Sequence, residues 1–525
     1  MYESNYLAQP YDKKGWLKGG LFLFSYLLTL IALSALVLVR KNSLAVLLIM
    51  LLAFSVSLDL FIQWIGSSQN GLNLEVFSLA INEAGRADNI LIFNGLLLKA
   101  ALVLLLVPIM LLGWRRIWPK RLRLSGRRVL LFAGLCLLLV AGLVFNIPSI
   151  QSHAYPALFK LPVISAEYWL RHRHQQPRVL AASIKPQQAA KYRTLIWIID
   201  ESVSGDYLSL NGYEKPTTPF LDSIKKNPDM FNFGVVNPIS NCSNTSNLLL
   251  RIGLTTTLPG NFQQLYARLP TVFAYAGRAG YETHLIDVQT SEGELQNHLS
   301  VDDLQYIDVH KSYSRAYTPQ QRDTLLGEYL REQLDREDQQ ARFIVAVKWG
   351  AHWPYPLAYP LERTVFEPTA RESLTPMTAE NREILTNAYA NVLRFTVDDF
   401  FHELLQQPLQ PDQLIFYTAD HGQSLFEKPD SPLTHCHYAT DPQQLPRGEF
   451  RVPMLVFTPD AKQQFARQPG RVYAQEQLFA TTLQWFGYDR TVYGQHGPTL
   501  YEGDERAYAE SFMLDSGLKI RFERP

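Results

Sequence analysis

The pattern of apolar and polar positions divides this chain into two parts. Long apolar runs dominate roughly the first 150 residues, and short apolar runs alternating with polar stretches dominate the remainder. A membrane-spanning helix needs about 20 largely apolar residues in succession. Four runs approach or exceed that length: Gly19–Val39, Leu44–Ile65, Ile90–Trp114 and Val129–Ile147. The pattern predicts a multispan α-helical membrane domain over residues 1–147, in preference to a cleavable signal peptide or a very hydrophobic globular core.

Basic residues orient the predicted spans. The segment Trp114–Arg128 carries seven lysines and arginines, and such short basic loops stay on the cytoplasmic side. Alternation then places everything after Ile147 on the outer side. The N-terminus would also lie outside although it carries Lys13, Lys14 and Lys18. Either the topology is N-out, or the first apolar segment is not a simple span.

Two ionisable residues, Asp59 and Lys99, fall inside the predicted spans. Ionisable side chains within the bilayer are functional candidates by default. Both positions are also close enough to an interface for the side chain to extend into water. The sequence leaves these two interpretations open.

The remainder of the chain predicts a layered α/β domain. Residues 148–192 contain five prolines with scattered aromatic residues, which favours a linker along the membrane surface. From residue 193 to 525, short β-rich runs alternate with longer helical patterns, an order typical of an α/β/α domain with a largely parallel sheet. The predicted strands are Thr194–Ile199, Thr283–Val288, Arg342–Trp349, Gln413–Thr418 and Val452–Phe457. The clearest helical patterns between them are Pro319–Arg336 and Glu380–Gln406.

Metal-binding residue types follow three of these strands. Asp200-Glu201, His352 and Asp420-His421 come at or just after strand ends, where ligands bind in open α/β sheets. A further cluster, Thr434-His435-Cys436-His437, follows shortly after His421. Each element alone is more typical of a helix cap or a surface pair. Their recurrence at successive strand ends predicts a metal site, and carboxylate with imidazole suits zinc.

A hydroxyl-rich turn supplies candidate nucleophiles. Residues Asn241–Asn247 are polar and precede the apolar run Leu248–Leu250, as at the start of a helix. A helix N-terminus stabilises anions, and a metal-bound hydroxyl there is easier to deprotonate. A plain N-cap is the alternative interpretation.

Charge and cysteine content narrow the picture further. Lysine plus arginine and aspartate plus glutamate number 49 each, so nothing in the charge balance predicts a nucleic-acid partner. Of the three cysteines, Cys136 lies in an apolar run. Cys242 and Cys436 could form one disulfide, which their spacing alone does not establish.

Several motifs together resemble the lipid A phosphoethanolamine transferases of the sulfatase/alkaline phosphatase superfamily. The resemblance rests on segments that occur in the same order and covers roughly residues 190–490. These segments are Glu201–Asp206, Leu210–Tyr213, Thr217–Pro219, Gly350–Pro354, Tyr417–Leu425 and Val452–Leu455. The resemblance implies an alkaline phosphatase-like (sulfatase-like) fold for residues 193–525.

The same resemblance implies roles for individual residues. A catalytic zinc ion would be held by Glu201, Asp420, His421 and the nucleophile oxygen. Counting the family's spacing from Cys242 makes Ser246 that nucleophile, with the adjacent Thr245 second. Two histidines, His352 and His435, would assist at a second-metal or phosphate position, with His437 as the alternative to His435.

The function implied is lipopolysaccharide modification. The protein would lie in the bacterial inner membrane with its catalytic domain in the periplasm. It would move phosphoethanolamine from phosphatidylethanolamine to lipid A or another envelope glycan through a phospho-Ser/Thr intermediate. The family's periplasmic disulfides are missing, four spans replace five, and Asp200 stands in place of glycine, as an added ligand or a cap. These departures leave the acceptor open.

Other functions remain as alternatives. A phosphoglycerol transferase or another phosphodiester hydrolase would use the same metal chemistry. A lipid-binding pseudoenzyme would keep the fold without the reaction. A sulfatase is disfavoured, because the chain has no Cys-x-Pro-Ser-Arg segment to supply a formylglycine nucleophile.

Overall fold

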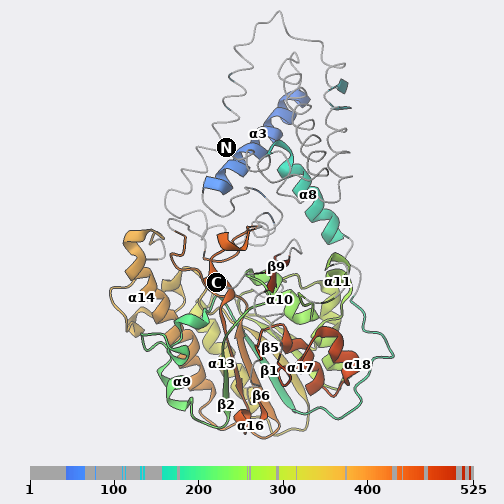
Figure 1. Cartoon of the computed structure of the whole chain (residues 1–525), viewed down its shortest axis with the longest axis vertical. Coiled ribbons are helices and arrows are strands. Elements are labelled where there is room, and N and C mark those ends of the chain that lie inside the picture. The colour runs from blue at the N-terminus through green and yellow to red at the C-terminus, as the bar shows by residue number, and fades with distance from the viewer. Residues whose placement is uncertain are drawn as a thin grey trace, which may run out of the picture. The chain divides into compact units, whose positions relative to one another are not determined.

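The computed structural model divides the chain into two compact units, Met1–Arg173 and His174–Pro525 (Figure 1). In the first unit it describes helix α3 (Ser43–Trp64), helix α8 (Ala157–Arg173) and a few isolated positions. In the second unit it describes residues 178–521 with short gaps. The gaps are residues 257, 259–261, 291–294, 315, 373–374, 429–433, 440, 466–470, 504–510 and 515–518.

Helices α3 and α8 form the described part of the first unit. The predicted span Leu44–Ile65 coincides with α3, and the other three predicted spans and Lys99 fall almost wholly outside the described residues. Among the helices that are described, none combines the length and the apolar character needed to cross a membrane. The number of spans therefore stays a prediction.

A buried ion pair connects these two helices. Lys160 Nζ of α8 lies 2.8 Å from Asp59 Oδ1 of α3, and both side chains are almost fully buried. The backbone N–H of Leu72 donates to the same carboxylate oxygen at 2.6 Å. Asp59 is therefore directed into this unit, and the alternative of a side chain that extends to an interface does not apply to it.

The second unit is built on a seven-stranded sheet with the order β2-β7-β6-β1-β5-β3-β4. Strand β7 pairs antiparallel with β6 and β2, and the remaining pairs are parallel, as predicted for the sheet as a whole. The strands are β1 (Thr194–Asp200), β2 (Met230–Val236), β3 (Glu282–Asp287), β4 (Val309–Lys311), β5 (Arg342–Val347), β6 (Gln413–Ala419) and β7 (Val452–Phe457). A separate hairpin joins β8 (Ser511–Met513) and β9 (Lys519–Arg521).

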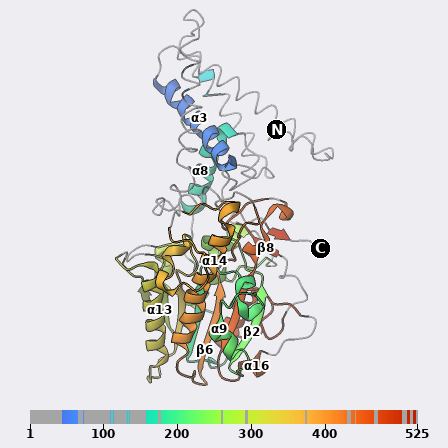
Figure 2. The same ribbon diagram turned by 90° about the vertical axis from the view of Figure 1, so that its left-hand side faces the viewer.

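Helices cover both faces of the sheet (Figures 1 and 2). One face carries α9 (Pro219–Ile224), α13 (Pro319–Leu334), α14 (Arg382–Leu393) and α15 (Phe400–Leu404), with a π-helical segment, Arg394–Asp399, between the last two. The opposite face carries α10 (Ser243–Ile252), α12 (Val272–Arg278) and α17 (Gln477–Trp485). The remaining helices are α11 (Phe262–Arg268), α16 (Ala461–Gln464) and α18 (Arg490–Tyr493). Short 3₁₀ turns lie at Gly205–Tyr207, Ser209–Asn211, Val301–Tyr306, Tyr355–Leu357, Leu361–Arg363, Ala379–Asn381, Pro442–Gln444, Arg447–Phe450 and Gly494–His496.

The core follows from the sequence of the central strands. Every residue of β1, β5 and β6 is buried, as expected for parallel strands covered on both faces. Trp197 of β1 packs edge-on against Phe343 of β5, with ring centroids 5.3 Å apart. Its indole N–H donates to Thr482 Oγ1 of α17 at 3.1 Å, so the one polar atom of this large side chain is satisfied.

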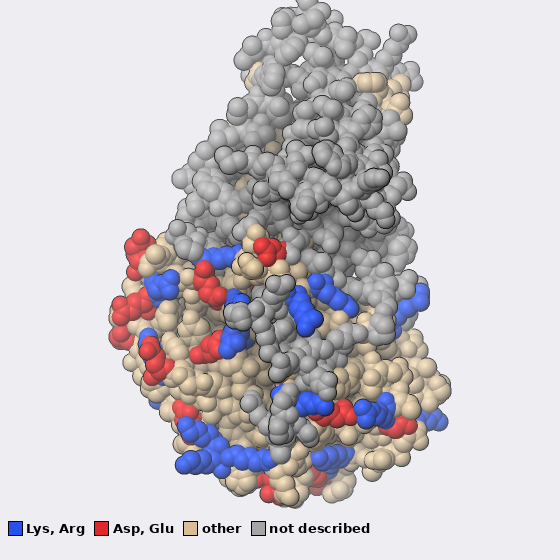
Figure 3. Space-filling view, in the orientation of Figure 1, with Lys and Arg blue, Asp and Glu red and all other residues tan. Residues whose placement is uncertain are grey.

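Charged side chains are mixed on the face of the second unit shown in Figure 3. Lysine and arginine side chains alternate there with aspartate and glutamate side chains, and no extended patch of one sign is visible on the described surface. This distribution agrees with the balanced composition and favours no nucleic-acid partner on that face.

Candidate active site

The C-terminal ends of β1 and β6 place the candidate ligands side by side. The two strands pair in parallel, with Asp200 opposite Ala419. Glu201 directly follows β1, and Asp420 and His421 directly follow β6. All three side chains are almost fully buried. The sheet thus brings together residues that are more than 200 positions apart in the sequence.

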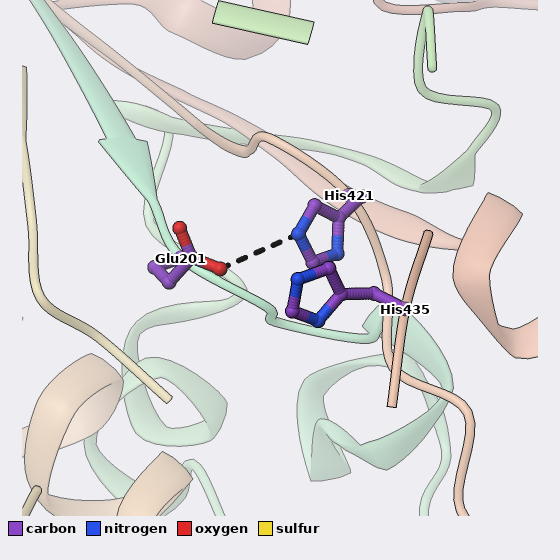
Figure 4. A group of neighbouring side chains, drawn as sticks. All are labelled: Glu201, His421 and His435. Carbon is purple, nitrogen blue, oxygen red and sulfur yellow. Dashed lines mark ion pairs between the residues drawn. The ribbon is translucent and has the colours of Figure 1, made fainter. Parts of the chain in front are cut away.

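Glu201, His421 and His435 form a group that could hold a metal ion (Figure 4). Each offers one ligand atom, and these atoms lie within 4.8 Å of one another. Glu201 Oε1 is 3.3 Å from His421 Nε2, and the His435 ring stacks on the His421 ring with centroids 4.3 Å apart. His437 instead bonds through Nδ1 to Glu449 Oε1, and Glu449 Oε2 accepts its backbone N–H. Of the two histidines left open by the sequence, the geometry favours His435.

Asp420 lies beside this group, and its two carboxylate oxygens differ in their hydrogen bonding. Its Oδ1 accepts the N–H groups of Ser202 at 3.1 Å and His421 at 2.7 Å. Its Oδ2 is buried and has no hydrogen-bond partner among the described residues. An unsatisfied buried carboxylate oxygen is costly, and a bound cation would satisfy it.

The tautomer of His421 also suits a ligand. Its Nδ1 lies 2.7 Å from the carbonyl oxygen of Gly422. A carbonyl oxygen only accepts, so Nδ1 carries a proton, and Nε2, which faces Glu201, is the nitrogen that could bind a metal ion once it has lost its own proton.

The buried carboxylates of the site favour a bound cation. Burial and the nearby Glu201 carboxylate raise the pKa of Asp420 well above its usual range. Burial lowers the pKa of His421, but Asp420 and Glu201 outweigh it and raise that pKa to about 9. Two buried carboxylates with imidazole ligands are a donor set that fits zinc.

Within the hydroxyl-rich turn, Ser243 is the residue whose hydroxyl contacts two of these ligands. This residue is the first of α10, and its N-cap Cys242 has an extended backbone. Ser243 Oγ lies 3.2 Å from Glu201 Oε1 and 3.0 Å from His421 Nε2. Ser243 belongs to the hydroxyl-rich turn that the sequence indicated, but the sequence alone did not single it out.

Ser246 and Thr245 occupy different places from those predicted. Ser246 is fully buried, and its hydroxyl donates to the backbone carbonyl of Asp420 at 2.6 Å. It lies nearly one helical turn beyond Ser243, about 4.5 Å further along the axis. Thr245 is rotated about 200° around the helix from Ser243, and both its N–H and its hydroxyl contact Asn244 Oδ1. The geometry therefore shifts the candidate nucleophile from Ser246 by three positions.

Asp200 is part of an ion pair rather than an added metal ligand. Lys348 Nζ donates to Asp200 Oδ2 at 2.9 Å, and the hydroxyl of Tyr417 donates to the same oxygen at 2.9 Å. The other oxygen, Oδ1, accepts the N–H of Glu201 at 3.0 Å. Burial raises the pKa of Asp200, while Lys348 and these hydrogen bonds oppose the rise.

Two further residues fix the carboxylate of Glu201. Gln289 Nε2 donates to Glu201 Oε2 at 2.9 Å and to the carbonyl of Lys348 at 2.7 Å. Ser202, which has a φ of 59°, donates its hydroxyl to Glu201 Oε1 at 2.7 Å. The sequence alone did not single out Gln289. It directly follows the predicted strand Thr283–Val288, and this position at a strand end could have identified it as a site residue.

His352 lies near the group without joining it. Its ring packs against Trp349 with centroids 5.1 Å apart, and its Nδ1 bonds to the carbonyl of Trp353 at 2.5 Å. Burial raises the pKa of Glu201, but the hydrogen bond and charge of His421, together with the charges of His352 and His435, hold it well below its usual range. His352 is therefore within electrostatic reach of the site.

Cys242 and Cys436 form a disulfide, with Cα atoms 4.7 Å apart. The open pairing of these two cysteines is thereby settled. The bond joins the residue before Ser243 to the residue after His435.

Comparison with known proteins gives relatives of one kind. The Kdo(2)-lipid A phosphoethanolamine 7''-transferase of Escherichia coli (strain K12) is 25% identical over 285 residues, covering 54% of this chain and 47% of that protein. Phosphoethanolamine transferase EptC of Escherichia coli O18:K1:H7 (strain RS218 / NMEC) is 25% identical over 326 residues, covering 59% of this chain and 54% of that protein. The chain spans about half the length of these curated relatives.

A solved structure extends the comparison. The integral membrane protein lipooligosaccharide phosphoethanolamine transferase A (EptA) from Neisseria meningitidis matches with a TM-score of 0.62 and 17% sequence identity. The match covers 94% of this chain and 93% of that chain, and at this identity it establishes the fold. The predicted alkaline phosphatase-like architecture of the second unit is therefore confirmed. The family model described as Sulfatase matches residues 193–488, more than half of the 525 residues, and the chain belongs to that family.

Proposed function

We propose that this chain is a zinc-dependent phosphoethanolamine transferase with Ser243 as its nucleophile. The observation that carries the proposal is the position of the Ser243 hydroxyl, at the N-terminus of α10 and within hydrogen-bond distance of both Glu201 and His421. The names of the curated relatives supply the transferred group, phosphoethanolamine.

The metal would be held by Glu201, Asp420, His421 and the oxygen of Ser243. Zinc, when bound, lowers the pKa of a hydroxyl ligand and neutralises charge that develops on a phosphoryl group. Gln289 and Ser202 hold the carboxylate of Glu201, and the N–H groups at the start of α10 favour an anion beside Ser243.

The first half of the reaction transfers the group to the enzyme. Ser243 Oγ attacks the phosphorus of phosphatidylethanolamine, an Oγ–P bond forms, and the bond from phosphorus to the diacylglycerol oxygen breaks. Oγ loses one proton and the departing oxygen gains one. We assign this proton exchange to the imidazoles of His435, whose ring stacks on that of His421, and of His352.

The second half returns the enzyme to its starting state. A hydroxyl or phosphate oxygen of the acceptor attacks the phosphorus and the Oγ–P bond breaks. The acceptor oxygen loses its proton and Ser243 regains one. Lipid A or another envelope glycan is the acceptor class that the relatives' names support.

The location we propose is the bacterial inner membrane, with multiple spans over residues 1–147, a linker over residues 148–192 and residues 193–525 in the periplasm. A lipid donor stays in the bilayer, so the enzyme that uses it benefits from a membrane anchor. The Cys242–Cys436 disulfide supports an oxidising compartment for the catalytic unit.

The alternative functions would use the same residues and differ in the donor lipid, in the need for an acceptor or in the formation of an adduct. A phosphoglycerol transferase would take phosphatidylglycerol with the same ligands, and a hydrolase would need no acceptor. A lipid-binding pseudoenzyme would bind zinc or lipid without forming an adduct. A formylglycine sulfatase is disfavoured, because Cys242 beside the nucleophile is bonded to Cys436.

The full-length chain in detergent, incubated with phosphatidylethanolamine, tests the proposal. We expect one phosphoethanolamine group to be added to the intact protein and its addition to stop after zinc is removed by a chelator. Phosphatidylglycerol is the matched donor, and labelling from it alone would establish the phosphoglycerol alternative. Failure of both lipids to label a zinc-loaded protein would refute the transferase.

A further inference from the structure

We propose that the Cys242–Cys436 disulfide is a positioning element of the metal site, holding the nucleophile helix and the His435 segment against the ligands. This inference rests on the proposed function only in taking Glu201, His421 and Ser243 as the metal group. It adds a covalent connection that neither the fold nor the relatives' names assign.

Each of the two cysteines is next to a site residue in the sequence. Cys242 is the N-cap of α10 and directly precedes Ser243. Cys436 directly follows His435, whose ring stacks on that of His421. The bond joins positions separated by 194 residues, so it connects two parts of the site that the local chain does not hold together.

Asn241, the residue before Cys242, also forms hydrogen bonds with the segment around Cys436. The N–H of Cys436 donates to the carbonyl of Asn241 at 2.9 Å. Asn241 Nδ2 donates to the carbonyl of His437 at 2.8 Å and to Glu449 Oε2 at 2.7 Å. Asn241 and Cys242 therefore anchor the backbone of the two residues that directly follow His435.

The backbone at Cys436 needs such an anchor. Its φ of 58° lies in the left-handed region, which a residue other than glycine rarely adopts. The surrounding structure must hold a residue in that conformation. The disulfide and the Asn241 hydrogen bond together do so and thereby direct the neighbouring His435 side chain toward the site.

The composition makes this bond the only disulfide that residues 174–525 can form within one chain. Cys242 and Cys436 are the only cysteines in that part of the sequence, and the third, Cys136, precedes it. Cys136 is thus a matched control for loss of a cysteine. Serine replacements remove the bond with little change in side-chain size.

Thermodynamic linkage gives a quantitative consequence. If the disulfide favours the arrangement that binds zinc, then bound zinc must favour the disulfide by the same factor. Residues that orient metal ligands typically change metal affinity by about 10–100-fold. We expect an effect in that range.

The first experiment measures zinc affinity of the full-length chain in detergent by competition with a chelator. The double variant Cys242→Ser/Cys436→Ser should bind zinc about 10–100-fold more weakly than wild type, and Cys136→Ser should bind it as wild type does. An unchanged affinity in the double variant would overturn the proposal, even if its melting temperature were lower.

The second experiment needs no cysteine variant and remains decisive if the double variant does not fold. A water-soluble phosphine reduces the disulfide of the wild-type chain: it supplies two electrons and takes the oxygen of one water molecule to become the phosphine oxide, and the two protons of that water complete the two thiols. Zinc should slow this reduction, and it should not do so in Glu201→Gln, which lacks a ligand. Equal reduction with and without zinc, or equal protection in Glu201→Gln, would overturn the proposal.

Neither experiment measures phosphoethanolamine transfer. A chain that shows this linkage but forms no adduct would refute the proposed function and leave the positioning role intact. A wild-type chain that binds no zinc would refute both.

Discussion

Lys348 Nζ lies 2.9 Å from Asp200 Oδ2 in a fully buried ion pair that joins the ends of β5 and β1, and Asp200 directly precedes the candidate ligand Glu201. Removing one partner of such a pair leaves an uncompensated buried charge. The pair is also connected to the site, because the N–H of Glu201 donates to Asp200 Oδ1.

We therefore predict that Lys348→Met lowers the free energy of unfolding by about 3–5 kcal/mol. The double variant Asp200→Asn/Lys348→Met should recover part of that loss, since neither charge of this pair remains and only Asp323 Oδ2, 4.0 Å from Lys348 Nζ, still loses its partner. Urea unfolding of the wild type, both single variants and the double variant gives the coupling energy. Additive effects of the two substitutions would contradict the pairing.

Gln289 should act on zinc affinity rather than on stability. Its amide holds Glu201 Oε2, which leaves Oε1 toward His421 and Ser243. We predict that Gln289→Ala weakens zinc binding about 10–100-fold, measured by chelator competition. The exposed Gln305, changed in the same way, is the control and should bind zinc as the wild type does. Equal affinities in the two variants would remove Gln289 from the site.

Gly350 should tolerate no side chain. Its φ is +56°, and a Cβ there would lie 2.0 Å from Asp200 Oδ1. Gly212 has a φ of +103° with open space where a Cβ would lie, so Gly212→Ala measures the cost of the positive φ without a steric clash. We predict that Gly350→Ala destabilises the protein by about 3–5 kcal/mol and Gly212→Ala by about 1–2 kcal/mol. Thermal unfolding of both variants measures this difference, and equal costs would argue against the close approach to Asp200.

Asp398 should make stability depend on pH. It accepts the N–H groups of Phe220 and Leu221 at the start of α9, but burial raises its pKa to about 6. The folded state then binds this proton more tightly than the unfolded state, whose pKa is near 4. The associated stability is fully present below about pH 4 and is lost as the pH rises through about 6.

Comparison with Asp398→Asn isolates this contribution. The wild-type unfolding free energy minus that of the variant should fall by on the order of 1–2 kcal/mol between about pH 4 and 7, after allowance for solvent screening. Urea unfolding at a series of pH values measures the difference. A difference that does not change with pH would show that the carboxyl titrates normally.

The sequence predicted the sheet well where burial controls the pattern. Val452–Phe457 matches β7 in both bounds, and the five predicted strands all exist. Strand β2 was missed because its residues are only partly buried at the edge of the sheet, and β4 has just three residues. Edge strands lack the continuous apolar run on which the prediction depended.

The candidate site was predicted less completely, for a different reason. The strand ends suggested Glu201, Asp420 and His421, and the structure brings these side chains together because neighbouring parallel strands end at one edge. The prediction of Ser246 as the nucleophile depended on a spacing counted from Cys242. The helix begins at the next residue, Ser243. The pairing of Asp200 with Lys348 depends on contacts between strands that are distant in sequence, which spacing along the chain does not reveal.

The identity of the nucleophile is the central claim, and localising the adduct tests it most directly. The wild-type chain, Ser243→Ala and Ser246→Ala are each incubated with zinc and phosphatidylethanolamine, and the peptide that contains residues 243–246 is fragmented in a mass spectrometer. We predict phosphoethanolamine on Ser243 in the wild type and in Ser246→Ala, and no adduct in Ser243→Ala. An adduct on Ser246 or Thr245, or one that persists in Ser243→Ala, would contradict the account.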